Sequence, residues 1–404
     1  MLRVFEAFSG YGSQSIALRN LGIEHEVVAI SEIDKYAIKA YEAIHGPTNN
    51  LGDICKIDPK DIPKHDLFTY SFPCQDLSVA GKQAGLGKGT RSGLLYECEK
   101  VIEAKKPKYL LLENVKNLIG KKFKPQFDAW LEYLEGLGYT NYWQVLNAKN
   151  YGVPQNRERV FVVSILGEHE PYEFPKPTPL DKCIADILED KVDEKYYINK
   201  PFHLVNKGHQ AELDIKGQDC IKRAYSTNKI APTLTTMQGG MREPKILCEG
   251  NIYPSGGQNG NIYNISGISP TINAGIGVKG NGVGSNNAPK ILTLPCICAS
   301  RGRNPENPSD RTAGVPTEQR LEFNTKGTSN TITTVQKDNY VVEPTYRIRK
   351  LTPRECFRLM GMRDYDIDKI QAVGISNTQQ YKMAGNSIVV NVLEAIFKNL
   401  FKGE

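Results

Sequence analysis

The sequence predicts an α/β protein with a parallel sheet covered on both faces and a long insert before its last helices. Short apolar runs alternate with helical patterns over residues 2–166, which is typical of βαβ units. A proline-rich boundary at 171–180 and a Gly- and Asn-rich stretch follow, and helical patterns return near residue 346. The 404 residues are too many for one small core and suit two domains or one domain with an insertion.

Each element of this fold has its own pattern. We expect strands at 2–8, 26–31, 66–71, 108–113, 142–147 and 159–166, and helices at 13–21, 34–45, 92–104 and 124–136. Ser13 is the expected cap of the first helix, and Gly22 its end. Further helices are expected at 352–361 and within 377–401, with Ala384-Gly385-Asn386-Ser387 opening the C-terminal one. Three similar strings, at 230–240, 268–278 and 328–339, favour short hairpins in the insert.

Composition and charge exclude several classes of protein. No apolar run is long enough to span a membrane and the first residues lack a signal-peptide pattern, so we expect a cytoplasmic chain. Nine cysteines without a C-x-x-C pair disfavour a disulfide framework, and we expect no metal site. The net charge of +6 comes entirely from residues after 195. This excess indicates either a solvated surface or a face that binds a polyanion.

Residues at the ends of the first strands suggest a site for an adenosine-bearing cofactor. Phe8-Ser9-Gly10-Tyr11-Gly12 lies between a strand and a helix, where glycines let a ligand approach backbone N–H groups. The third glycine of the dinucleotide fingerprint is absent, so a plain tight turn also fits this segment alone. Glu32 could accept hydrogen bonds from ribose hydroxyls, and Asp53 from an adenine amino group.

Cys74 is a candidate nucleophile. A lone cysteine is ordinarily a small buried hydrophobe, but this one follows Pro73 at a strand end, at the same sheet edge as the glycine turn. Residues 78–93 come next, are rich in glycine and contain no acidic residue. The basic residues of this segment are Lys82, Lys88 and Arg91. They suit a mobile loop that closes over phosphates.

Glu113 and two arginines complete the candidate chemistry. Glu113 ends an apolar strand, so its carboxyl group should have a raised pKa and could donate a proton near neutral pH. The alternative is that Glu113-Asn114 caps the helix that follows. Alternation along the strand that follows places Arg157 and Arg159 on one face, and a solvated edge or a surface ion-pair set is the alternative interpretation.

Taken in order, these pieces resemble the cytosine-5 DNA methyltransferase family. The matching segments cover about 1–165 and 346–390 and are FSGYG, Glu32, GDI, PCQ, ENV, QNRER, LTPRECFRLMG and AGNS. The resemblance implies a Rossmann-like, S-adenosylmethionine-dependent methyltransferase domain at 1–184. It also implies a mostly β and irregular target-recognition domain inserted at 185–345, and a segment at 346–404 that completes the catalytic domain.

The resemblance further implies roles for the catalytic residues. Cys74 would attack carbon 6 of a cytosine flipped out of double-stranded DNA. Glu113 would bind ring nitrogen 3 and the amino group. Arg159, with Arg157 near it, would bind the pyrimidine carbonyl and the phosphate side.

The cofactor implied by the resemblance is S-adenosyl-L-methionine. The residues expected to hold it are Phe8, Gly10, Gly12, Glu32, Asp53, Ile54, Pro73, Leu94 and Asn386. Residues that read bases cannot be carried over from the family. The candidates rest on the general preference of arginine for guanine and phosphate, and are Arg242, Arg301, Arg303 and Arg311.

Three other functions stay open at this point. An RNA cytosine-5 methyltransferase would use the same catalytic set, although an insert of this length favours duplex DNA. A nicotinamide-dependent oxidoreductase would explain the glycine turn and Glu32 but leaves Cys74 and Glu113 without a role. A catalytically inactive DNA-binding protein is the third. We expect a monomer, whose setting could be a pair with a separate restriction endonuclease, a phage or an orphan role.

Overall fold

The computed structural model describes residues 1–73, 94–198, 200, 202–205, 208–237, 240–248, 262–263, 290–291, 296–303, 318–323, 339–342 and 347–402. The chain divides into two compact units. Unit 1 comprises Met1–Glu189, Ile215–Pro244 and Leu351–Glu404, and unit 2 comprises Asp190–Asp214 and Lys245–Lys350. The predicted insert of 185–345 differs from unit 2, because residues 215–244 fold with unit 1.

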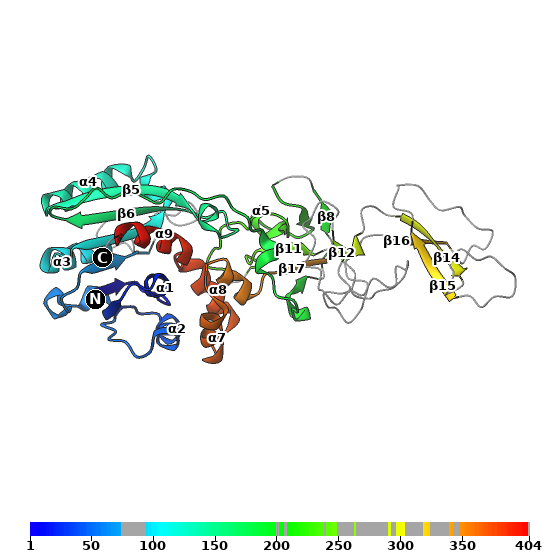
Figure 1. Ribbon diagram of the computed structural model, residues 1–404, viewed down its shortest axis with the longest axis horizontal. Coiled ribbons are helices and arrows are strands. Elements are labelled where there is room, and N and C mark those ends of the chain that lie inside the picture. The colour runs from blue at the N-terminus through cyan, green and yellow to red at the C-terminus, as the bar shows by residue number, and fades with distance from the viewer. Residues whose placement is uncertain are drawn as a thin grey trace. The chain divides into compact units, whose positions relative to one another are not determined.

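Unit 1 is built on a six-stranded sheet of order β2-β1-β3-β4-β6-β5 (Figure 1). Its strands are β1 (Leu2–Ala7), β2 (His25–Ser31), β3 (Leu67–Tyr70), β4 (Tyr109–Val115), β5 (Tyr139–Asn147) and β6 (Glu158–Leu166). The prediction of a parallel sheet is confirmed for β1 to β4 and wrong for β6, which runs antiparallel to both of its neighbours, β4 and β5. The link from β5 to β6, residues 148–157, has no crossover helix, and a parallel pair needs one.

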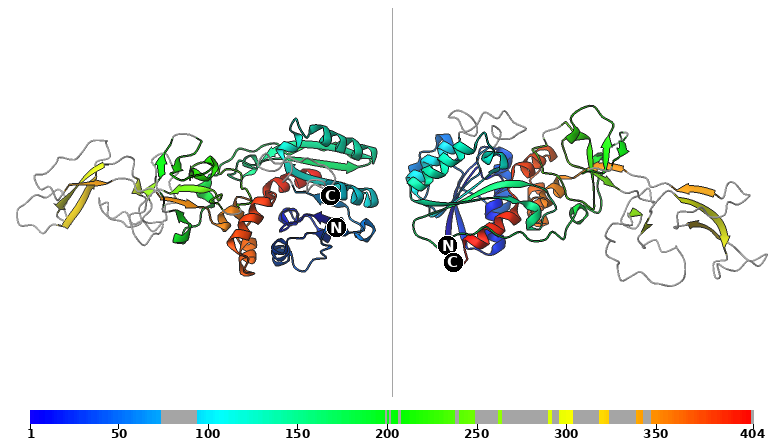
Figure 2. Two further views of the ribbon diagram at one scale, coloured as in Figure 1. Left: turned by 180° about the vertical axis from the view of Figure 1, so that it is seen from behind. Right: turned by 90° about the horizontal axis from the view of Figure 1, so that it is seen from above.

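Helices cover both faces of this sheet. Unit 1 contains α1 (Ser13–Leu21), α2 (Lys35–His45), α3 (Leu95–Lys105), α4 (Lys124–Gly136), α6 (Pro353–Arg358), α7 (Asp364–Ala372), α8 (Asn377–Asn386) and α9 (Val390–Leu400). Phe5 of β1 shares a hydrophobic core with residues of α3 and α4. Its neighbour Glu6 accepts hydrogen bonds from Ser15 of α1 and Tyr41 of α2. Since successive strand residues face opposite ways, the two helix pairs lie on opposite faces, as Figure 2 shows.

Two predicted helix starts are wrong. The N-cap position of α1 is Gly12, with φ 81°, and Ser13 is already helical. Ala384-Gly385-Asn386-Ser387 does not open the C-terminal helix, because Asn386 ends α8 and α9 begins at Val390. The predicted stop at Gly22 is confirmed by its left-handed backbone, φ 72°. In the part of the chain that the structure describes, no helix has the length and apolar character needed to cross a membrane.

Unit 2 contains short strands. In one group β7 (Tyr197–Ile198) and β11 (Lys245–Cys248) flank β17 (Arg347–Lys350), all antiparallel, and β8 (Phe202–Leu204) pairs with β9 (Ala211–Leu213). In another group β14 (Cys296–Arg303) pairs antiparallel with β15 (Glu318–Phe323) and β16 (Asn339–Val342). The remaining elements are β12 (Ile262–Tyr263) and β13 (Lys290–Ile291), with β10 (Arg223–Ser226) and α5 (Asp219–Lys222) belonging to unit 1.

Candidate active site

Glu113 and Arg159 form an ion pair between two neighbouring strands. Glu113 lies in the last half of β4 and Arg159 at the start of β6, and Arg159 Nε is 3.1 Å from Glu113 Oε1. Glu113 is only 7% exposed. Burial raises the pKa of Glu113, while the positive charges of Arg159 and Arg157 oppose that rise. This carboxyl group therefore holds a proton more readily than an exposed glutamate does.

Arg157 is buried and binds backbone carbonyls. Its Nη1 donates to Leu234 O at 3.0 Å, and its Nη2 donates to Gly385 O at 3.1 Å and Ser387 O at 2.8 Å. As alternation predicts, Arg157 and Arg159 line one small cavity, together with Glu113.

Asn114 connects the end of β4 to the segment that leads to Cys74. Its Nδ2 donates to Phe72 O at 3.1 Å, and both residues are buried. The alternative role of Glu113-Asn114 as a side-chain cap is not observed for the short helix at Lys116–Ile119. Cys74 and the basic residues Lys82, Lys88 and Arg91 lie outside the described residues.

A hollow of about 400 Å³ opens where Arg159 reaches the surface. Its lining is Val115, Lys116, Asn117, Asn156, Glu158, Arg159 and Thr233. Lys116 Nζ donates to Glu158 Oε2 at 3.0 Å, and the Lys116 side chain remains 55% exposed. Arg159 and Lys116 give the hollow two cationic donors, which suit a carbonyl or a phosphate oxygen.

Residues 231–237, called the strap below, supply Thr233 to this hollow. Ala231 N donates to Pro154 O and Asn156 N donates to Ala231 O, both at 2.8 Å. Thr233 Oγ1 donates to Asn156 O at 2.5 Å. The hairpin predicted at 230–240 is therefore wrong for its described residues, which form one isolated bridge to Gln155. The string at 268–278, and the string at 328–339 except for Asn339, lie outside the described residues.

The glycine turn after β1 is held by Glu32. Gly10 N donates to Glu32 Oε2 at 3.0 Å, and Glu32 Oε1 accepts from Ile33 N at 2.8 Å and Asp34 N at 2.9 Å. A Cβ at Gly12 would lie 2.4 Å from His45 Nε2, so glycine is required there. A Cβ at Gly10 would meet no atom within 4 Å, which leaves room for a ligand over the turn.

The other residues predicted to hold a cofactor lie near the same strand ends. Ile54 is part of the hydrophobic core against which Phe8 and Leu94 pack, and Pro73 is half-buried. Asp53 accepts from Cys55 N at 3.1 Å and keeps a side chain that is 36% exposed. Ser9 Oγ is buried with no hydrogen-bond partner among the described residues. Two carboxylates, an apolar floor and an unpartnered hydroxyl fit a ligand with ribose hydroxyls and an adenine ring. Asn386 is exposed at the end of α8.

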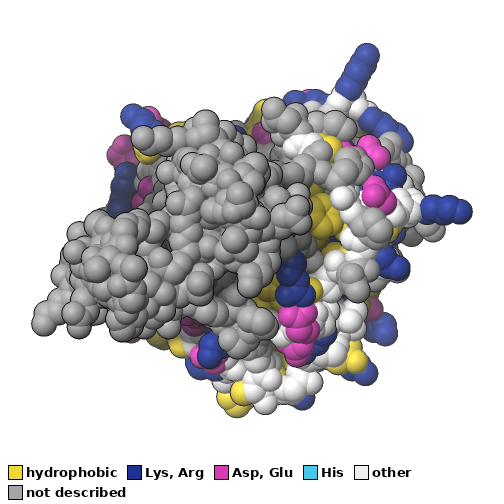
Figure 3. Space-filling view, turned by 90° about the vertical axis from the view of Figure 1, so that its right-hand side faces the viewer, with side chains coloured by type: hydrophobic (Ala, Val, Ile, Leu, Met, Phe, Trp, Pro, Cys, Tyr) yellow, Lys and Arg dark blue, Asp and Glu magenta, His cyan; other side chains and the backbone are white. Residues whose placement is uncertain are grey.

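The candidate base-reading arginines are only partly covered by the structure. Arg242 is exposed, Arg301 and Arg303 lie on β14, and Arg311 lies outside the described residues. On the face that Figure 3 shows, the described Lys and Arg side chains stand at several separate points, with Asp and Glu side chains among them. The predicted polyanion-binding face therefore stays a prediction.

Comparison with known proteins settles the family. A family model described as C-5 cytosine-specific DNA methylase matches residues 2–402. This chain belongs to that family. The methylase is 34% identical to the type II methyltransferase M2.ScrFI of Lactococcus lactis subsp. cremoris over 100% of both chains. It is 36% identical to the orphan methyltransferase M.SPRI of Bacillus phage SPR, over 99% of this chain and 97% of that one.

Solved structures agree with the fold. The S. pombe Dnmt2 methyltransferase has a TM-score of 0.58 at 16% identity, covering 100% of the methylase and 99% of its own chain. The Entamoeba histolytica methyltransferase EhMeth has a TM-score of 0.59 at 16% identity, covering 100% and 98%. The predicted family, Rossmann-like α/β fold and enzyme class, a cytosine-5 DNA methyltransferase, are confirmed.

Sequence reasoning missed three residues that the structure brings to the site. Lys116 lines the hollow and directly follows ENV. Its charge does not stand out in the sequence, because residues 1–180 carry no net charge. Thr233 reaches the hollow from a segment that the sequence assigns to the insert. Tyr11 lies inside the glycine turn, yet its hydroxyl donates to Ser387 Oγ at 2.8 Å. Position beside a motif gave a signal for Lys116 and Tyr11, but none for Thr233.

Proposed function

We propose that the methylase transfers a methyl group from S-adenosylmethionine to carbon 5 of a cytosine flipped out of a specific double-stranded DNA sequence. A covalent bond between Cys74 and carbon 6 carries the reaction. The observation that supports this most is the buried pair of Glu113 and Arg159, part of which faces a hollow of about 400 Å³. Asn114 joins that pair to the backbone two residues before Cys74.

The chemistry explains why a thiol is needed. Carbon 5 of cytosine is a poor nucleophile. When the Cys74 thiolate forms a bond to carbon 6, the electron pair of the ring double bond becomes available at carbon 5, which takes the methyl group. A base then removes the proton from carbon 5, the bond between carbon 6 and sulfur breaks, and the aromatic ring and the thiolate are restored.

Glu113 and Arg159 would stabilise the ring during this attack. Protonated Glu113 donates to ring nitrogen 3, which neutralises the charge that builds up as sulfur adds. Arg159 would donate to the pyrimidine carbonyl, since its side chain is 17% exposed and lines the hollow. Arg157 adds positive charge near Glu113, and its guanidinium donates a hydrogen bond to the backbone carbonyl of Leu234.

S-adenosylmethionine supplies the methyl group as a sulfonium when it is bound. Glu32 and Asp53 would accept hydrogen bonds from it, and Phe8, Ile54 and Leu94 would contact its adenine. The open space over Gly10 would take its methionine end, with Pro73 and Asn386 completing the pocket by resemblance.

We also propose that unit 2 reads the DNA sequence, with Arg242 of unit 1 and with Arg301, Arg303 and Arg311 as candidate contacts. Flipping the base costs a few kcal/mol. Phosphate contacts from residues 78–93 and base contacts from unit 2 would offset that cost. We propose that the methylase acts as a monomer, and gel filtration with light scattering tests this.

Two experiments test the function. Bisulfite sequencing of DNA from cells that express the methylase should reveal methylated cytosines in one sequence context. In a methylation assay with labelled S-adenosylmethionine, label that appears in tRNA and not in DNA would overturn the proposal. DNA that carries 5-fluorocytosine in that context should form a covalent adduct that survives a denaturing gel, because fluorine cannot leave as a proton does. Cys74→Ser should form no adduct and transfer no methyl group, whereas Cys55→Ser, an exposed cysteine, serves as the control.

A further inference from the structure

A continuous set of hydrogen bonds runs from the glycine turn to the strap. Tyr11, 1% exposed, donates its hydroxyl proton to Ser387 Oγ at 2.8 Å. The carbonyl oxygen of the same Ser387 accepts from Arg157 Nη2 at 2.8 Å. The other amino group of Arg157, Nη1, donates to Leu234 O at 3.0 Å. The buried side chain of Arg157 thus links Ser387, which accepts a hydrogen bond from the glycine turn, to Leu234 of the strap.

The strap is also fixed by direct contact at both sides of Leu234. A Cβ at Gly385 would lie 1.9 Å from Thr235 O, so the end of α8 and the strap touch backbone to backbone. Gln155 Oε1 accepts from Leu234 N at 3.2 Å, and its Nε2 donates to Leu359 O at 2.7 Å. A displacement of Ser387 would therefore also move Leu234, which is next to Thr233 in the hollow.

We propose that Arg157 is a positioning residue that couples cofactor binding at the glycine turn to DNA binding at the hollow. A cofactor that settles on Gly10 and Gly12 fixes Tyr11, and through Ser387 and Arg157 it fixes the strap that presents Thr233. This inference rests on the proposed function. Because such coupling is reciprocal, bound DNA strengthens cofactor binding by the same factor.

Arginine suits this role for a geometric reason. Its planar fork directs two amino groups at three carbonyl oxygens at once, whereas a lysine ammonium is a single point on a flexible stem. The Arg157 charge also acts on both Tyr11 and Glu113. The same side chain is therefore electrostatically close to the turn and to the candidate base-binding group.

The test measures coupling directly, on the full chain. The dissociation constant of a short fluorescent duplex, carrying the sequence that bisulfite sequencing identifies, is measured with and without saturating S-adenosylhomocysteine. The ratio of the two constants is the coupling factor. Arg157→Lys and Tyr11→Phe should each lower the coupling factor by at least about fivefold, toward the value of one that means no coupling. A purely structural defect would weaken both binding constants together and leave the ratio unchanged.

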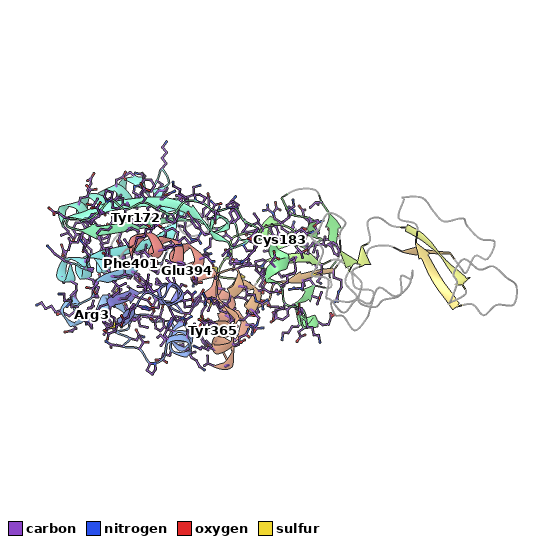
Figure 4. The ribbon with its side chains drawn as sticks, in the orientation of Figure 1. Arg3, Tyr172, Cys183, Tyr365, Glu394 and Phe401 are labelled. Atoms are coloured by element: carbon purple, nitrogen blue, oxygen red, sulfur yellow. The ribbon has the colours of Figure 1, made fainter. Side chains whose placement is uncertain are left out.

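Tyr172→Phe is the matched control. Its hydroxyl is buried without a hydrogen-bond partner among the described residues, and Figure 4 labels it. This variant should keep the parent coupling factor. If Arg157→Lys fails to fold in a thermal scan, Tyr11→Phe, which removes one oxygen atom, carries the test alone.

Two results would overturn the inference while leaving the proposed function intact. One is a parent coupling factor of one in a methylase that transfers methyl groups. The other is retention of the parent factor by a folded Tyr11→Phe variant. A parent that binds neither probe would overturn the proposed function and the inference together.

Discussion

Arg159 Nε lies 3.1 Å from Glu113 Oε1, and these two side chains are 17% and 10% exposed. A carboxyl group in this position is subject to two opposite effects, because burial favours its neutral form and the guanidinium favours its charged form. Such a balance leaves Glu113 able both to donate a proton to a bound base and to take it back.

Glu113→Gln should lower kcat for methyl transfer by about 10²–10⁴, since an amide cannot transfer the proton to ring nitrogen 3. Steady-state methylation of the duplex at saturating cofactor measures kcat, and a single-turnover experiment shows whether the loss lies in the methyl-transfer step. Glu158→Gln removes an exposed carboxylate that lines the hollow beside Arg159 and should stay near the parent rate. Equal rates for Glu113→Gln and Glu158→Gln would contradict the assigned role.

Glu6 gives folding stability a dependence on pH. Its carboxyl is fully buried, and burial raises its pKa from 4.5 to about 7 despite hydrogen bonds from Ser15 and Tyr41. The folded chain therefore binds this proton more tightly than the unfolded chain. The stability contributed by protonated Glu6 is complete below about pH 4.5 and is lost as pH rises to about 7.

Glu6→Gln should abolish this loss. The free energy of unfolding of the variant relative to the parent should rise by ~3 kcal/mol between about pH 5 and about pH 8. Urea unfolding at both pH values measures it. The half-buried His45 and the buried His65, whose pKa values are lowered to about 4, titrate in both proteins and cancel in the difference. A difference that does not change with pH would show that Glu6 is charged throughout.

Lys116 should contribute one phosphate contact. Lys116→Ala is expected to weaken DNA binding and to reduce the slope of log affinity against log salt by about one. Lys100→Ala is the matched control, because Lys100 is 59% exposed and ion-paired to Glu97, much as Lys116 is 55% exposed and paired to Glu158. Identical salt slopes for the two variants would remove Lys116 from the DNA interface.

Gly385 should tolerate no side chain. Gly385→Ala places a Cβ 1.9 Å from Thr235 O, and because that atom is backbone, the strap or α8 must move. We expect a loss of about 1–3 kcal/mol in the free energy of unfolding. Gly136→Ala, where a Cβ meets no atom within 4 Å, should be neutral or stabilising. Thermal or urea unfolding compares the two, and equal stability would mean that the strap yields freely.

The catalytic half of the fold could be predicted because its signals are local. The glycines after β1 and the ENV segment lie at the carboxyl ends of parallel strands, which meet at one edge of the sheet. QNRER comes to the same edge because it opens β6, which runs antiparallel to β4. The direction of β6 and the partners of Arg157 could not be predicted in this way. Leu234, Gly385 and Ser387 are far from Arg157 in sequence, and only tertiary packing brings their carbonyl groups to it.

The position of the strap in unit 1 has a consequence for exchanging specificity between relatives. The chain leaves unit 1 after Glu189, returns for Ile215–Pro244, and leaves again until Lys350. A chimera that swapped 185–345 as one block would import a foreign strap against the native Arg157 and Gly385. A graft that replaces 190–214 and 245–350 but retains the host's own 215–244 would keep every hydrogen bond of Arg157 in register. Recombination between such enzymes should therefore succeed more often with crossovers on either side of the strap.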